Sequence, residues 1–169
     1  MKRIEINKKY RGYGYIVYAT DMGHRCGYIK IPRNHYLYEK SYGEQLNIKF
    51  KKLKNEQMGK RNPITIFCSA GVKPEDNISM DLLFDVHGGI TFSGKGKRLA
   101  IDKLGWWVGF DCAHSGDGKD FSIMDDKYKE IEEKYNLGNY GTIRTKEYVE
   151  QECKNLIDQI IKYFDKESK

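Results

Sequence analysis

The sequence predicts a single α+β domain, a mainly antiparallel sheet covered by a long C-terminal amphipathic helix. Short β-branched and aromatic runs, separated by Gly- and Pro-containing turns, fill the first two thirds of the chain. After residue 125 the pattern changes to charged helix formers and a helical apolar repeat. Strands followed by helices are typical of α+β domains. The 169 residues suffice for one core, and no repeat divides them, so we treat 1–169 as one domain.

The first strands are predicted from alternation and from β-forming residues. Residues 3–7 alternate in polarity and indicate a short edge strand. Residues 13–18 and 26–31 are rich in aromatic and β-branched side chains, and a turn at 21–24 joins them into a hairpin. Pro32 cannot donate a hydrogen bond to a neighbouring strand, so it ends the second strand.

The next part of the chain, residues 46–78, is expected to be a basic elaboration of the domain. Residues 46–50 and 63–68 read as short strands. Between them, residues 51–62 hold five Lys or Arg and predict a mobile basic loop.

Two apolar runs in the middle of the chain predict buried strands. Residues 80–86 are apolar on both faces, as in a central strand, and residues 106–110 form the second run. Gly88 and Gly89 interrupt the first run. The other expected segments are a strand continuation at 90–92, a basic glycine loop at 94–98 and a polar loop at 111–120.

The C-terminal third predicts two helices. Residues 125–135 indicate a short helix with Ile131 facing inward, stopped at 137–139. Thr145 is a good N-cap for the second helix, with Glu147 in its first turn. Its apolar face is predicted to contain Tyr148, Val149, Cys153, Leu156, Ile157, Ile160, Ile161 and Phe164.

Charge and composition limit the partners. A net charge of +6 and a pI near 9.0 favour an anionic small molecule, although a general Lys-rich composition explains the same charge. Nucleic acid is not favoured, because the Lys residues form no stripe. No apolar run is long enough to span a membrane, and residues 1–10 lack the apolar centre of a secretory signal. We therefore expect a cytoplasmic protein, whose oligomeric state, a homo-oligomer included, the sequence leaves open.

Clustered His and Asp residues form a candidate divalent-metal site. His87, Asp111, His114 and Asp117 offer two imidazoles and two carboxylates on segments that follow the two apolar runs. Such ligands suit Zn, Mn or a similar ion, which could activate water or polarise a phosphoryl group. The alternative is a hydrogen-bonded polar loop that caps the strand ends.

Cys112 is a candidate nucleophile. His87 or His114 could act as its base. If the protein is an enzyme, the expected catalytic residues are His87, Asp111, Cys112 and His114. The alternative is a small buried side chain, since free Cys is among the most buried residue types. The four cysteines form no Cys-x-x-Cys pair, so a disulfide framework is not expected.

A third candidate is a pocket for a phosphate-bearing ligand. Backbone N–H groups of the Gly88-Gly89 pair and of the 94–98 loop could hold phosphate, and a Trp could stack a base. Adjacent Trp residues on a strand face opposite sides, so one packs in the core. The alternative for the 94–98 loop is a solvated turn. The expected ligand-binding residues are His87, Gly88, Gly89, Thr91, Ser93, Lys95, Lys97, Arg98, Trp106, Trp107, Asp111 and His114.

Four pieces of the sequence carry a resemblance to a known family. They are Gly27-Tyr28-Ile29-x-Ile31-Pro32-x-x-His35-x-x-Tyr38, Val86-His87-Gly88-Gly89-Ile90-Thr91-Phe92-Ser93-Gly94, Trp106-Trp107-Val108-Gly109-Phe110-Asp111-Cys112-Ala113-His114-Ser115-Gly116-Asp117 and Arg144-Thr145-x-Glu147-Tyr148-Val149. With them the chain resembles a family of small uncharacterised bacteriophage and prophage proteins, over about residues 26–160. The family reads Gly-His-Pro-x-Tyr-Gly near position 35, where this chain has Asn34, His35, Tyr36 and Glu39.

The resemblance implies a setting, the cytoplasm of a bacterial host. By analogy with small phage proteins that counter host defences, we expect a protein that sequesters an anionic, nucleotide-like molecule. Two alternatives remain open: a metal-dependent or Cys/His hydrolase of a phosphate-containing substrate, and a module that binds a host protein through its Tyr-rich surface.

Overall fold

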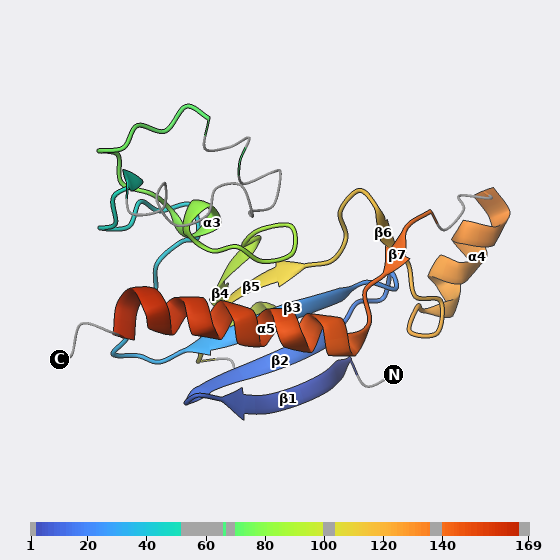
Figure 1. Ribbon diagram of the computed structural model, residues 1–169. Coiled ribbons are helices and arrows are strands. Elements are labelled where there is room, and N and C mark those ends of the chain that lie inside the picture. The colour runs from blue at the N-terminus through green and yellow to red at the C-terminus, as the bar shows by residue number, and fades with distance from the viewer. Residues whose placement is uncertain (1–2, 52–65, 67–69, 100–103, 136–139, 166–169) are drawn as a thin grey trace.

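A five-stranded antiparallel sheet with one long helix on its face forms the centre of the molecule (Figure 1). The computed structural model describes residues 3–51, 66, 70–99, 104–135 and 140–165. The strands are β1 (Ile4–Tyr10), β2 (Tyr13–Ala19), β3 (Arg25–Ile31), β4 (Phe92–Lys95) and β5 (Trp106–Asp111), in the spatial order β1-β2-β3-β5-β4. The predicted α+β class is confirmed.

Local turn chemistry connects the first three strands, and it confirms the predicted edge strand and hairpin. Arg11 and Gly12, between β1 and β2, both have positive φ, as a tight hairpin turn requires. Gly23, with φ +85, lies in the turn between β2 and β3. Tyr15 of β2 then pairs with Ile29 of β3.

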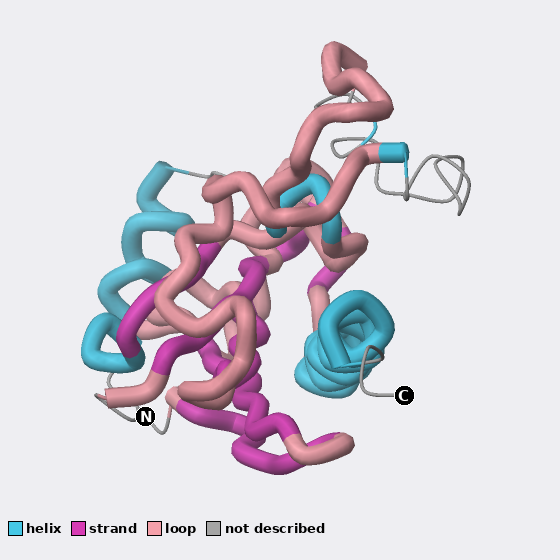
Figure 2. The backbone as a smooth tube through the Cα atoms, turned by 90° about the vertical axis from the view of Figure 1, so that its left-hand side faces the viewer, coloured by secondary structure: helices cyan, strands magenta, loops and turns pink. Residues whose placement is uncertain are grey.

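Helix α5 (Lys146–Ile160) packs on the sheet and is continued by a π-helical turn, η3 (Ile161–Asp165). Figure 2 shows the helix nearly end-on beside the sheet. The Thr145 side chain accepts a hydrogen bond from the N–H of Tyr148, which confirms the predicted cap. The buried residues follow the predicted face: Val149, Cys153, Leu156, Ile157 and Ile160. Tyr148 does not belong to this face, because it is 36% exposed and turns toward the polar region described below.

The two faces of the sheet carry separate apolar clusters. Trp106 packs against the main core, which lies between the sheet and α5. Trp107 lies on the opposite face with Ile16, Cys26 and Tyr28. The prediction that the two Trp residues face opposite sides is therefore confirmed.

The predicted strand at 80–86 is wrong. Met80–Leu83 form a short helix, α3, and the chain then continues outside the sheet. Met80, Leu83, Phe84 and Val86 are all buried in the main core. A short apolar run of this kind is therefore compatible with a short buried helix as well as with a central strand.

Several other expectations for the middle of the chain are corrected. Residues 46–50 form only one isolated bridge, Lys49 to Asn77, although Leu46 is fully buried. The predicted glycine loop at 94–98 is divided between the end of β4 and a 3₁₀ turn, η2 (Gly96–Leu99). Residues 63–68 and 51–62 lie outside the described residues except for Lys51 and Ile66, and Ile66 is helical rather than extended.

Helix α4 (Asp126–Tyr135) confirms the expected short helix, but Ile131 is 42% exposed rather than inward. The expected stop at 137–139 lies outside the described residues. The polar loop at 111–120 contains a short strand, β6 (Asp117–Gly118), which pairs in parallel with β7 (Thr142–Ile143). Among the described helices, none has the length and apolarity to cross a membrane.

The contact between α5 and β3 depends on Gly27. A Cβ at this position would lie 2.5 Å from Cζ of Phe110 and 2.6 Å from Sγ of Cys153. We expect Gly27→Ala to lower the free energy of unfolding by about 1–3 kcal/mol through overpacking. In the matched control, Gly43→Ala, the added Cβ meets nothing within 4 Å, so the change should stay within about 0.5 kcal/mol. Urea unfolding measures both variants, and equal effects would contradict the close contact.

Candidate functional site

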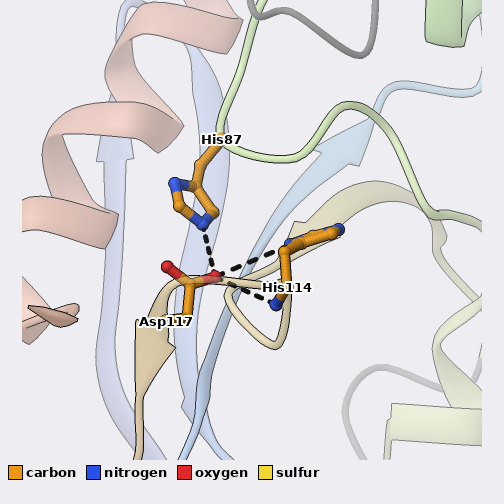
Figure 3. Close-up of side chains that lie close together, drawn as sticks. All are labelled: His87, His114 and Asp117. Atoms are coloured by element: carbon orange, nitrogen blue, oxygen red, sulfur yellow. Dashed lines mark hydrogen bonds and ion pairs between the residues drawn. The ribbon is translucent and has the colours of Figure 1, made fainter. Parts of the chain in front are cut away.

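Three segments that are distant in the sequence meet beside the start of α5. They are the turn after α3, which contains His87 and Gly88, the loop between β5 and β6, and the first two turns of α5. Figure 3 shows the His87 ring pointing at Asp117, whereas the His114 ring extends away from Asp117 with Nδ1 at its near end. The expectation that residues 87–89 and 111–117 are neighbours is confirmed.

Asp117 lies at the centre of this group, with a side chain only 2% exposed. Its Oδ1 accepts a hydrogen bond from Nε of Arg144 at 2.8 Å. Its Oδ2 accepts the backbone N–H of His114 at 3.0 Å and lies 2.7 Å from Nε2 of His87. Burial raises the pKa of Asp117, but the hydrogen bonds from Arg144, His87 and His114 outweigh it and hold that pKa below the ordinary value.

His87 is fixed at three points. Its backbone N–H donates to Oε2 of Glu152 at 2.8 Å. Its ring lies between Asp117, at Nε2, and the hydroxyl of Tyr148, 3.1 Å from Nδ1. Because an ionised carboxylate only accepts hydrogen bonds, the neutral ring carries its proton on Nε2. Nδ1 is then an acceptor for the Tyr148 hydroxyl.

Gly88 allows His114 to lie against the backbone of this turn. Gly88 has φ +65, and a Cβ there would lie 2.0 Å from Cε1 of the His114 ring. The His87 and His114 rings are 5.7 Å apart, edge to face. Within the described part of the chain, Nδ1 of His114 has no hydrogen-bond partner. The nearest carboxylate oxygens are Oδ2 of Asp117 at 3.7 Å and Oδ1 of Asp111 at 3.8 Å.

Asp111 organises the loop rather than joining the cluster. Its Oδ2 accepts from the hydroxyl of Thr91 at 2.7 Å, and its Oδ1 accepts the N–H of Ala113 at 3.1 Å. Of the four predicted metal ligands, the structure places donor atoms of His87, His114 and Asp117 within 4.8 Å of one another. Two nitrogens and one carboxylate are a set that can hold a transition-metal ion.

A groove of about 390 Å³ opens on the other side of His87. Arg144 stacks its guanidinium over the Tyr148 ring, 5.1 Å from the ring centroid. Burial raises the pKa of the Tyr148 hydroxyl, as it does that of the Glu152 carboxyl. The described lining consists of Asp85, Val86, His87, Arg144, Tyr148, Glu152 and Asn155.

Sequence reasoning missed Arg144, Tyr148 and Glu152 as functional residues. Tyr148 satisfied the apolar repeat of α5 and was therefore assigned to the core. One signal was present, because the N-terminal end of a helix disfavours a cation, so an Arg directly before the N-cap suggests a nearby carboxylate. Asp117 supplies that carboxylate.

The proposed role of Cys112 as a nucleophile has no support in the structure. Its side chain is 1% exposed and belongs to the main core. Burial, followed by the charge of Asp117, raises the pKa of the Cys112 thiol. The thiolate is therefore disfavoured, and the core packing matches the alternative of a small buried side chain.

The predicted ligand site is divided between two ends of the sheet. Lys95 pairs with Trp106 at the first residue of β5, whereas Asp111 is its last residue. Five residue steps along a strand span roughly 16 Å. A single pocket that includes both the 94–98 segment and the 111–117 loop is therefore not formed, because β4 and β5 run antiparallel.

The remaining predicted residues have other contacts. Trp107 lines a separate hollow of about 430 Å³ on the sheet face away from α5, together with Lys9 and Lys30. Ser93 accepts the backbone N–H of Tyr42 at 2.9 Å, and the N–H of Gly89 donates to the carbonyl of Val86. Lys97 and Arg98 lie in η2, beside Lys95; Lys97 is exposed, and the Arg98 side chain is outside the described part.

The buried ion pairs of Asp117 generate a pH-dependent prediction. Its pKa is lowered in the folded state, so its stabilisation is complete above the ordinary value of 3.8 and is lost as pH falls through the folded pKa. Asp117→Asn should lower the free energy of unfolding at neutral pH by about 3 kcal/mol and flatten the acid dependence of stability. Urea unfolding at neutral and acidic pH measures this. Asp111→Asn is the control, and an equal loss for both variants would contradict the central role of Asp117.

The site thus combines an oriented imidazole, a tyrosine hydroxyl, an arginine and a possible metal-ligand set beside one groove. Its chemistry is inferred from its own residues. No family model, curated protein or solved structure matches this chain.

Proposed function

We propose that this protein binds a small phosphate-bearing, nucleotide-like anion in the groove beside His87, Arg144 and Tyr148. One observation carries the proposal: Arg144 uses only its Nε to hold Asp117. Within the described part of the chain, its two terminal nitrogens make no hydrogen bond, and its side chain is 28% exposed. A guanidinium fixed in this way presents a preorganised donor fork to a phosphate.

The charges along the groove favour a ligand with two different ends. Arg144 supplies positive charge and donors at one end, whereas Glu152, Asp85 and Asn155 supply acceptors elsewhere in the lining. A phosphate fits beside Arg144, and hydroxyl or amino groups of a sugar or base fit beside the carboxylates. The groove volume lies in the range of small-molecule sites.

The resemblance to phage proteins supports a biological role for such binding. A phage protein made in the bacterial cytoplasm could sequester a nucleotide signal of the host and so act against a host defence. The phosphate-binding groove is the part of the molecule on which this role would depend.

Thermal unfolding with a panel of mono-, di- and cyclic nucleotides, in buffer with EDTA, tests the proposal. A ligand present at 100 times its Kd should raise Tm by roughly 5 °C or more. Arg144→Lys keeps a cation beside Asp117 but removes the planar fork, so it should reduce the ligand-induced shift. Arg11→Gln, which removes an arginine that pairs with Asp158 and does not line the groove, should leave the shift unchanged. A panel without any shift would overturn the proposal.

Hydrolysis of the bound phosphate compound is a second candidate function, favoured by the chain of contacts from Asp117 through His87 to Tyr148. A carboxylate that fixes the tautomer of a His prepares the ring for proton transfer. If the protein releases phosphate or opens a phosphodiester, His87→Gln should reduce the rate by about 10²–10⁴-fold. Chromatography of the incubated nucleotides measures this, with His24→Gln as the control. Intact nucleotides after incubation with protein that binds them would leave binding alone as the function.

A further inference from the structure

We propose that His87, His114 and Asp117 bind one divalent transition-metal ion, of the kind represented by Zn²⁺. Their donor atoms lie within 4.8 Å of one another (Figure 3). Around a tetrahedral ion, with ligand distances of about 2.1 Å, donors stand roughly 3.4 Å apart. Nε2 of His87 and Oδ2 of Asp117, now at 2.7 Å, would separate slightly, and Nδ1 of His114, at 3.7 Å, would move closer.

Nδ1 of His114 is the atom that most favours a cation at this place. The atom is buried and has no hydrogen-bond partner among the described residues. It lies nearly equidistant from two carboxylate oxygens, of Asp117 and of Asp111. A buried imidazole nitrogen left without a partner is destabilising. A metal ion between Nδ1 and the carboxylates would satisfy the nitrogen and balance their negative charge.

The contacts behind the three ligands are those of a supported metal site. Arg144 holds the second oxygen of Asp117, and Tyr148 contacts the second ring nitrogen of His87. Such outer contacts fix the orientation of metal ligands in proteins. With an ion on Nε2, the His87 proton would lie on Nδ1 and donate to the Tyr148 oxygen. The close approach of His114 is made possible by the missing side chain of Gly88.

The ligand chemistry selects the class of ion. Two imidazoles and one carboxylate suit Zn²⁺, Mn²⁺ or Fe²⁺, whereas Ca²⁺ and Mg²⁺ prefer oxygen ligands alone. Asp111 or water would supply a further ligand. The ion would use the same His87 nitrogen that donates to Asp117 in its absence, so a metal-loaded site excludes proton transfer through that atom. The inference does not depend on nucleotide binding, because it is tested with the metal alone.

Isothermal titration of the full-length protein with ZnCl₂, after removal of metals with EDTA, tests the inference. We expect one Zn²⁺ per chain, and Co²⁺ in its place should give visible absorption bands of a low-symmetry site. His114→Gln should abolish stoichiometric binding, whereas His24→Gln should retain it. Far-UV circular dichroism verifies that both variants are folded.

A pair of glycine variants tests the geometry without removing a ligand. Gly88 and Gly89 both have positive φ, but only at Gly88 would a Cβ occupy the place of the His114 ring. Gly88→Ala should therefore weaken Zn²⁺ binding by about 10-fold or more, and Gly89→Ala should weaken it much less. The inference is overturned if the wild-type protein takes up no Zn²⁺, if His114→Gln binds it equally well, or if the two alanine variants behave alike.

Discussion

The buried carboxylate of Asp117 is the constraint on which the functional region depends. A carboxylate that is only 2% exposed must be compensated by partners. Here each partner comes from a different part of the chain: His87 from the turn after α3, His114 from the loop after β5, and Arg144 from the segment before α5. The electrostatic requirement of one side chain therefore fixes the mutual positions of three segments.

The sheet and α5 provide the frame for that arrangement. The pairing of Cys26 with Asp111 sets where β5 ends, and therefore where the loop that contains His114 begins. Gly27 lets α5 approach the sheet closely enough for Cys153 to pack beside it. With α5 packed on the sheet in this way, Tyr148 and Glu152 in its first turns contact His87. The packing of the core thus determines which polar groups meet.

The parts of the fold that could be predicted are those whose composition or periodicity favours one kind of element. β2 and β3 are rich in aromatic and β-branched residues, β5 is a short apolar run, and the buried face of α5 repeats at helical spacing. The strand predicted at residues 80–86 was wrong because a short apolar run shows no periodicity that separates a helical turn from a strand. The prediction that Ile131 faces inward was wrong because none of the described residues of α4 is buried.

The candidate site was predictable only where chemistry was concentrated in the sequence. The His and Asp residues at 87 and 111–117 were recognised as candidates by their residue types. Their proximity was expected because each of two apolar runs ends in such polar residues. Tyr148 lies on the last helix, where the helical repeat offered a sufficient structural reason for it, and Arg144 lies just before the N-cap of that helix. Lys95 and Lys97 are separated from Asp111 because β4 and β5 pair in antiparallel fashion, with Lys95 opposite Trp106. The direction in which two strands pair cannot be deduced from composition.

The short parallel pair of β6 and β7 brings Asp117 and Arg144 together whatever the length of the chain between these strands. Asp117 pairs with Thr142, and Gly118 pairs with Ile143, so the two strands close a loop that contains α4. The backbones touch so closely that a Cβ on Gly118 would lie 2.8 Å from the carbonyl oxygen of Gly141. Arg144 follows directly and reaches Asp117. The segment that contains α4 is consequently a natural position for insertions, peptide tags or a fused domain, because its length does not enter the geometry of the groove.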